Sequence, residues 1–189
     1  MSDFKLYFEE GWKHIVSTDA TDHILFIVAL GAVYQIKYWK QVLILVTAFT
    51  VGHSLTLALS AYDIIRFNTQ WVEFLIPCTI ALTALYNILH KKHERFGVNY
   101  FLALFFGLIH GMGFANTIRF MLASDQQIAL PLFSFNLGLE AGQILVVMLL
   151  LLLHYVIVGK QASRHKVWVY TLSTLTLVWG AWLAIQRIP

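Results

Sequence analysis

The sequence predicts an all-α polytopic membrane protein: a bundle of six transmembrane helices preceded by an interfacial amphipathic helix. Of its 189 residues, 59% are hydrophobic and only 12% are charged, and the mean hydropathy of +0.70 is far from the balance of a soluble domain. Apolar runs of about 20 residues recur along the chain, long enough to cross a bilayer core as helices. Alternating strand patterns are absent from the sequence. We therefore expect a single membrane domain over residues 1–189.

The first element, over residues 3–16, predicts a helix that lies in the membrane interface. Its apolar residues recur at helical spacing and its charged residues fall between them, which is typical of such helices. The opening residues include Glu9 and Glu10 and have no basic start or small-residue cleavage site of a secretory signal peptide. We expect this segment to be retained and to serve as an anchor or a lid.

Six apolar segments then follow as candidate spans. We place them at about 20–37, 40–62, 70–90, 98–118, 130–157 and 167–187. The loops after the first, third and fifth spans hold eight of the 13 Lys and Arg residues. Because positive charge favours the cytoplasmic side, we expect those loops inside and both termini outside. This distribution explains the pI near 9.0 better than nucleic-acid binding does.

The second span carries an ionisable residue, His53, deep within its apolar sequence. Ionisable groups are costly inside a membrane, and they usually face the bundle interior and mark an ion or substrate path. Counted from Lys40 at 1.5 Å per residue, His53 lies about 20 Å from the cytoplasmic end. A histidine in a membrane helix can also serve only as a hydrogen-bonding group between helices, so its neighbours decide its role.

Two further residues are expected at a similar depth. His110 lies about 18 Å up the fourth span, and Glu140 lies about 13 Å below the outer end of the fifth. Glu140 forms a polar stripe with Asn136 and Gln143, at helical spacing on an otherwise apolar segment. The spans therefore predict a polar cluster in the outer half of the bundle, with Asn136 and Gln143 in supporting positions.

The mouth of this cluster is expected at the start of the first span, where Asp19, Asp22 and His23 lie close in sequence. Imidazole and carboxylate groups suit divalent first-row metals. The only cysteine, Cys78, supplies no thiolate pair and allows no disulfide within the chain. Nickel, cobalt, zinc or iron would fit such a donor set, whereas a copper(I) site is disfavoured.

Several motifs along the chain, taken together, resemble one known family. They are Gly11-x-x-His14, Asp22-His23-Ile24-Leu25-Phe26, Phe49-Thr50-x-Gly52-His53-Ser54, Phe106-Gly107-x-x-His110-Gly111-x-Gly113-Phe114-Ala115 and Phe135-Asn136-x-Gly138-x-Glu140-x-Gly142-Gln143. In this order they resemble the HupE/UreJ membrane proteins, a family associated with nickel or cobalt uptake for hydrogenase and urease. The resemblance implies a bacterial inner-membrane protein whose metal ligands are His14, Asp22, His23, His53 and His110.

Two departures bear on the metal. Seven residues separate His14 from Asp22, whereas the nickel-transporting branch of the family has five at this place. The chain also lacks a carboxylate directly after His110-Gly111. It is therefore more similar to the second branch of the family, for which nickel specificity rests on analogy.

Three functions remain open at this point. The main hypothesis is a transporter of a divalent metal, nickel or cobalt. Its expected partners are the metal ion and membrane lipid, and no nucleic acid. The oligomeric state is left open, and a homo-oligomer is possible. The second is an intramembrane hydrolase with zinc bound by His23, His53 and His110, Asp22 or Glu140 as the general base, and Ser54 beside His53. The third is a haem-binding electron carrier with His53 and His110 as axial ligands.

Overall fold

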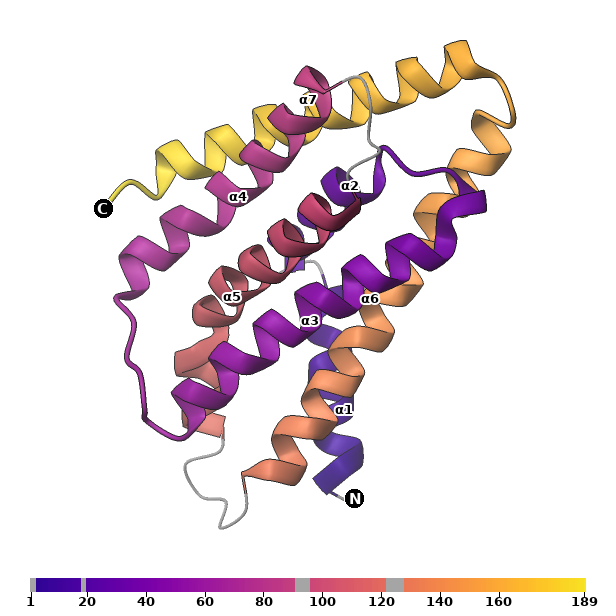
Figure 1. Cartoon of the computed structure of the whole chain (residues 1–189). Helices are drawn as coiled ribbons and strands as arrows, with labels where there is room; N and C mark the ends of the chain where they lie inside the picture. Colours follow the sequence, from indigo (N-terminus) through magenta and orange to yellow (C-terminus); the bar gives the residue numbers. More distant parts are fainter. Residues whose placement is uncertain (1–2, 18–19, 91–95, 122–127) are drawn as a thin grey trace.

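The computed structural model describes residues 3–17, 20–90, 96–121 and 128–189. These residues form a helical bundle without strands in the described ranges, as the composition predicts (Figure 1). The elements are α1 (Asp3–Val16), α2 (Thr21–Gly31), a short 3-10 turn η2 (Ile36–Tyr38), α3 (Trp39–Ala61), α4 (Thr69–Leu89), α5 (Phe96–Met121), α6 (Ala129–Ile157) and α7 (Ala162–Gln186).

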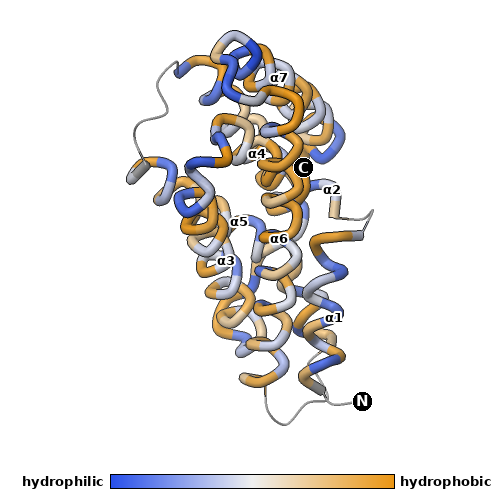
Figure 2. Tube along the Cα trace, turned by 90° about the vertical axis from the view of Figure 1, so that its right-hand side faces the viewer, coloured by the Kyte–Doolittle hydropathy of each residue, from blue (hydrophilic) through white to orange (hydrophobic). Residues whose placement is uncertain are grey.

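Five of the described helices, α3 to α7, are long and apolar enough to cross a membrane. Hydrophobic residues dominate all five (Figure 2). The region expected as the first span, 20–37, differs: its α-helix α2 has only 11 residues, about 16 Å at 1.5 Å per residue. A bilayer core is about 30 Å thick, so α2 alone reaches only about halfway across.

α1 precedes α2 and packs against the same helix, α6, so the two together cover more of the membrane than α2 alone. α1 packs most extensively on α6. Its residues Phe8 and Trp12 lie against Gly138, and Ile15 lies against Gly142, so α1 and α6 run in the same direction. Farther along α6, Leu150 contacts Gly31 at the end of α2. Together α1 and α2 follow α6 as one interrupted helix, while the interfacial position of α1 stays a prediction.

The other helices pack mainly as two pairs, α3 with α5 and α4 with α7. At the α3–α5 crossing, Gly107 lies against the backbone of Phe49, and Gly111 lies against the backbone of His53. Glycine is required there because a Cβ atom on Gly107 would overlap the Phe49 carbonyl. Small residues that let helix backbones approach are typical of membrane bundles. The crossing brings the parts of α3 and α5 that carry His53 and His110 together.

Buried polar side chains also tie the helices to one another. Thr50 donates a hydrogen bond to Gln143 at 2.7 Å, linking α3 to α6, and Asn87 donates to the Ala29 carbonyl at 2.7 Å, linking α4 to α2. Just after the C-terminal end of α3, Asp63 accepts hydrogen bonds from Arg66. That guanidinium lowers the pKa of the Asp63 carboxyl.

The close α3–α5 crossing gives a first prediction. Gly107→Val should lower the thermal stability of the purified protein, because the added side chain must push α5 away from Phe49; overpacking of this kind costs about 1–3 kcal/mol or more. Thermal unfolding in detergent measures the effect. Gly97→Ala is the matched control, since a Cβ at Gly97 meets nothing within 4 Å. Equal melting temperatures for the two variants would contradict the packing described.

Candidate metal centre

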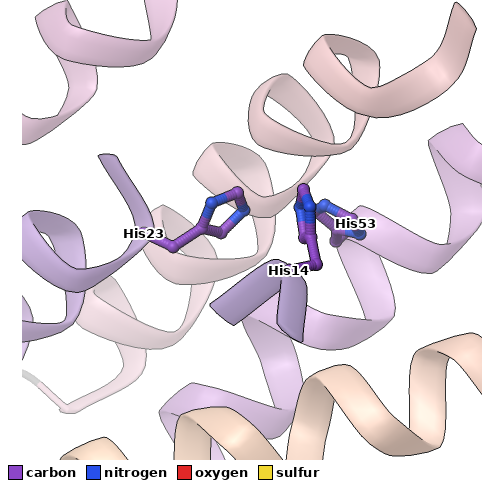
Figure 3. Close-up of side chains that lie close together, drawn as sticks. All are labelled: His14, His23 and His53. Carbon is purple, nitrogen blue, oxygen red and sulfur yellow. The ribbon is translucent and has the colours of Figure 1, made fainter. Parts of the chain in front are cut away.

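Two histidines are placed by the interruption between α1 and α2. His14 lies in the last turn of α1 and His23 in the first turn of α2. Because the chain leaves its helical path between them, both rings turn inward to the same place (Figure 3). Their ring centroids are 4.7 Å apart. Interrupted membrane helices commonly form ion and substrate sites in this way.

The α3–α5 pair supplies two more histidines. His53 on α3 is fully buried, with ring centroids 5.9 Å from His14 and 5.7 Å from His23. His110 on α5 lies 5.2 Å from the His23 ring. The structure thus brings together four of the sequence-predicted site residues, from four different helices.

Three of these rings have the spacing of a metal site. One nitrogen atom each from His14, His23 and His53 lies within 4.8 Å of the other two. Nitrogen ligands bound to one ion at 2.0–2.1 Å with tetrahedral angles would be about 3.3 Å apart. Small side-chain rotations would therefore close the three rings around a divalent cation.

The nitrogen atoms of this cluster are buried without partners among the described residues. They are His14 Nε2, His23 Nε2, His110 Nδ1 and both ring nitrogens of His53. A buried polar atom that lacks a hydrogen bond costs about 1–3 kcal/mol, so such groups usually have a partner. A cation bound by the imidazoles would supply one. The remaining nitrogen of His110, Nε2, lies 2.9 Å from Thr79 Oγ1.

Aromatic side chains surround the four rings and limit their movement. Phe114 contacts His14 with a centroid distance of 4.2 Å and stacks on Phe135. On the opposite side, Phe26 and Phe49 each lie 5.1 Å from His110. Phe114 also lines the cavity that reaches the cluster, whereas Phe26, Phe49 and Phe135 do not.

A cavity of about 390 Å³ reaches the cluster; it is called the outer cavity here because the distribution of basic residues predicts that it faces outside. Its wall includes His14, His23 and His110, together with the ionisable residues Asp22, Glu73 and Arg187. The Arg187 guanidinium donates a 2.8 Å hydrogen bond to Asp22 Oδ2, whereas Asp22 Oδ1 is buried without a partner. The cavity therefore offers a carboxylate oxygen at the entrance to the histidines.

Other residues predicted for the site lie elsewhere or outside the described ranges. Glu140 accepts a 2.7 Å hydrogen bond from Thr47 on α3 and is not part of the clustered histidines. Gln143 pairs with Thr50 in the same α3–α6 contact, and the Asn136 amide donates to its own helix at the Leu132 carbonyl. Asp19 lies outside the described residues.

Ser54, the candidate nucleophile of the hydrolase hypothesis, follows His53 on α3. Successive helical residues point about 100° apart, so the two side chains face different directions. Ser54 also lies outside the set of residues that line the outer cavity. The geometry gives it no position beside the clustered nitrogens.

The sequence did not point to Arg187 and Glu73 as residues of this site. Arg187 follows the last helix, and it reaches Asp22, 165 positions earlier in the chain, only because α7 packs against α2. For Glu73 the sequence contained one indication. Pro77 cannot donate a hydrogen bond to the Glu73 carbonyl, so this turn of α4 is expected to be irregular.

Comparison with known families agrees with the motifs. The family model described as HupE / UreJ protein matches residues 1–187. The chain belongs to the HupE/UreJ family. This match covers essentially the whole chain, including α7, which carries none of the motifs noted in the sequence. Comparisons with curated proteins and with solved structures give no significant match.

The residues of this HupE/UreJ protein fit the metals with which its family is associated. Three imidazole donors and a nearby carboxylate oxygen suit nickel, cobalt and zinc, and the described part of the cluster offers no thiolate. The arrangement can capture a cation from the outer cavity and replace part of its hydration shell with ring nitrogens.

The contact between Arg187 and Asp22 gives a second prediction. Arg187→Ala should raise the affinity for a divalent cation by about 3- to 10-fold, because it removes a positive charge from the cavity and frees an oxygen of Asp22. Titration of the detergent-purified protein with nickel measures the change. Arg187→Lys, which keeps the charge, is the control. Weaker binding by Arg187→Ala would show that the guanidinium positions Asp22 for the metal and does not compete with it.

Proposed function

We propose that this HupE/UreJ protein transports a divalent transition metal, nickel or cobalt, across the bacterial inner membrane. In this proposal His14, His23 and His53 hold the cation, His110 is the next ligand along the path, and Asp22 receives it at the outer entrance. Glu140 is assigned no ligand role, because its carboxylate faces Thr47. Both termini are placed on the outer side.

One observation carries the proposal: partnerless imidazole nitrogens lie at the base of an open cavity inside a membrane bundle. A purely structural role would pair each histidine with a neighbouring helix. His14, His23 and His53 instead bring ring nitrogens within 4.8 Å of one another, while His110 contacts Thr79 on α4 through one of its nitrogens. Such an arrangement is unfavourable for the protein alone and favourable for a cation that enters from outside.

The direction of movement follows from the two ends of the bundle. Lys37 in η2 and Lys40 at the start of α3 lie at the opposite end from the cavity that contains Asp22, as do Lys160, between α6 and α7, and Arg164, in the first turn of α7. Basic loops favour the cytoplasmic side. The cavity therefore faces outward in this proposal, and the metal moves inward.

A hydrolase stays the second candidate, favoured by the same cavity. A zinc ion on the histidines with a water molecule in the open position, and Asp22 as its base, would resemble known catalytic zinc sites. The haem alternative does not fit the packing around the two histidines. Phe49 packs against the rings of both His53 and His110, where a haem held between them would need room.

Uptake of nickel by reconstituted vesicles tests the transport proposal. His53→Asn should reduce uptake at least about tenfold, because it removes one of three clustered nitrogen ligands and loss of even an outer-shell partner lowers metal affinity about 10- to 100-fold. His90→Ala is the matched control. His90 is exposed at the end of α4 and should leave uptake unchanged.

Normal uptake by His53→Asn would contradict the proposal. A wild-type protein that holds one zinc ion tightly and shows no flux would favour the hydrolase instead. Metal analysis of the purified protein, made beside the flux measurement, separates these two outcomes.

A further inference from the structure

A second cavity lies toward the opposite end of α2, α4 and α5, three of the helices that line the outer one. It has a volume of about 340 Å³ and is lined by the end of α2, the last two turns of α4 and the first part of α5. On the same helices the outer cavity contacts Asp22, Glu73 and His110. Thus α2, α4 and α5 line two cavities in succession, one on each side of the histidine cluster.

Only a thin layer of protein separates the two cavities. On α5, His110 belongs to the outer wall and Phe106 to the inner wall, which is four residues or about 6 Å along the helix. On α4, the outer wall ends at Ile76 and the inner wall begins at Leu82, about 9 Å apart. The barrier is therefore about one to two helical turns thick along these helices.

The barrier contains a polar group that contacts the cluster. Thr79, 3% exposed, lies on α4 between the two cavities and is in hydrogen-bond contact with His110 Nε2. One turn farther along, the Thr83 hydroxyl donates to the Thr79 carbonyl, and Asn87 follows after another turn. Thr83 and Asn87 both line the inner cavity, as does Asn99 on α5. A polar stripe on α4 therefore runs from His110 into the inner cavity.

The rest of the barrier is aromatic. Phe26 makes an edge-to-face contact with Phe106, at a centroid distance of 6.0 Å, and also contacts His110. Phe26 is 1% exposed, so no water-filled connection passes its ring. The outer cavity reaches His14, His23 and His110, whereas none of the clustered histidines lines the inner cavity. This is the arrangement of one state of an alternating-access transporter.

We propose that the inner cavity between α2, α4 and α5 is the cytoplasmic exit for the metal, and that Phe26 and Phe106 form its gate. The proposal rests on the proposed transport function. After the gate rings move apart, His110 and Thr79 pass the cation to hydroxyl and amide oxygens of Thr83, Asn87 and Asn99. Oxygen ligands of this kind bind nickel or cobalt more weakly than imidazole does, so the ion regains water and leaves.

Two changes at Thr83 test the polar stripe. Thr83→Val keeps the shape of the side chain and removes its oxygen, so it should lower nickel flux in vesicles about five- to tenfold and leave nickel affinity in detergent unchanged. Thr83→Ser restores an oxygen and should keep most of the flux. Wild-type flux in Thr83→Val would overturn the proposal.

Chemical labelling tests the same cavity without measuring transport. In a Cys78→Ser background, Leu102→Cys places a thiol at a half-buried position on the wall of the inner cavity, where a membrane-impermeant thiol reagent should reach it from the side of the basic loops. Ala48→Cys is the control, because Ala48 is 2% exposed and lies outside the lining of this cavity. An unreactive Leu102→Cys in a protein that transports nickel overturns the exit route alone. Absence of flux in the wild-type protein overturns the transport function itself.

Discussion

Imidazole nitrogens buried in an apolar bundle impose the main constraint on this structure. His53 has neither of its nitrogens paired within the described residues, and each such atom costs about 1–3 kcal/mol. The protein nevertheless arranges the surrounding helices to place more histidines beside it. The break between α1 and α2 contributes His14 and His23, and the glycine crossing of α3 and α5 contributes His110. These features are explained together if a cation supplies the missing partner.

The constraint also accounts for the two cavities. A cation must lose water to reach the histidines and regain it after leaving them, so polar groups are needed on both sides of the cluster. Asp22 and Glu73 provide them in the outer cavity, and Thr83, Asn87 and Asn99 provide them in the inner one. Between the two cavities, the rings of Phe26 and Phe106 lie on the side of the inner one. In the proposed function the cluster is thus a point on a route as well as a binding site.

Hydropathy predicted the helical membrane fold because bilayer thickness limits how a chain can satisfy its backbone. It did not predict the short α2, since apolar composition continues past Gly31 where the helix ends. Counting depth along each helix suggested the neighbours of His53, but depth does not give direction around a helix axis. For this reason Glu140 was expected beside the histidines, whereas its carboxylate bonds to Thr47. The contact of Arg187 with Asp22 depends on helix packing alone.

In the proposed function, ring nitrogens from α1, α2 and α3 bind one metal ion. X-ray absorption spectroscopy of the nickel-loaded protein tests it most directly, because imidazole rings give a characteristic outer-shell scattering pattern. We predict a signal from at least three imidazoles in the wild-type protein and the loss of one in His53→Asn. A spectrum with oxygen ligands only, or one unchanged by His53→Asn, would contradict the account.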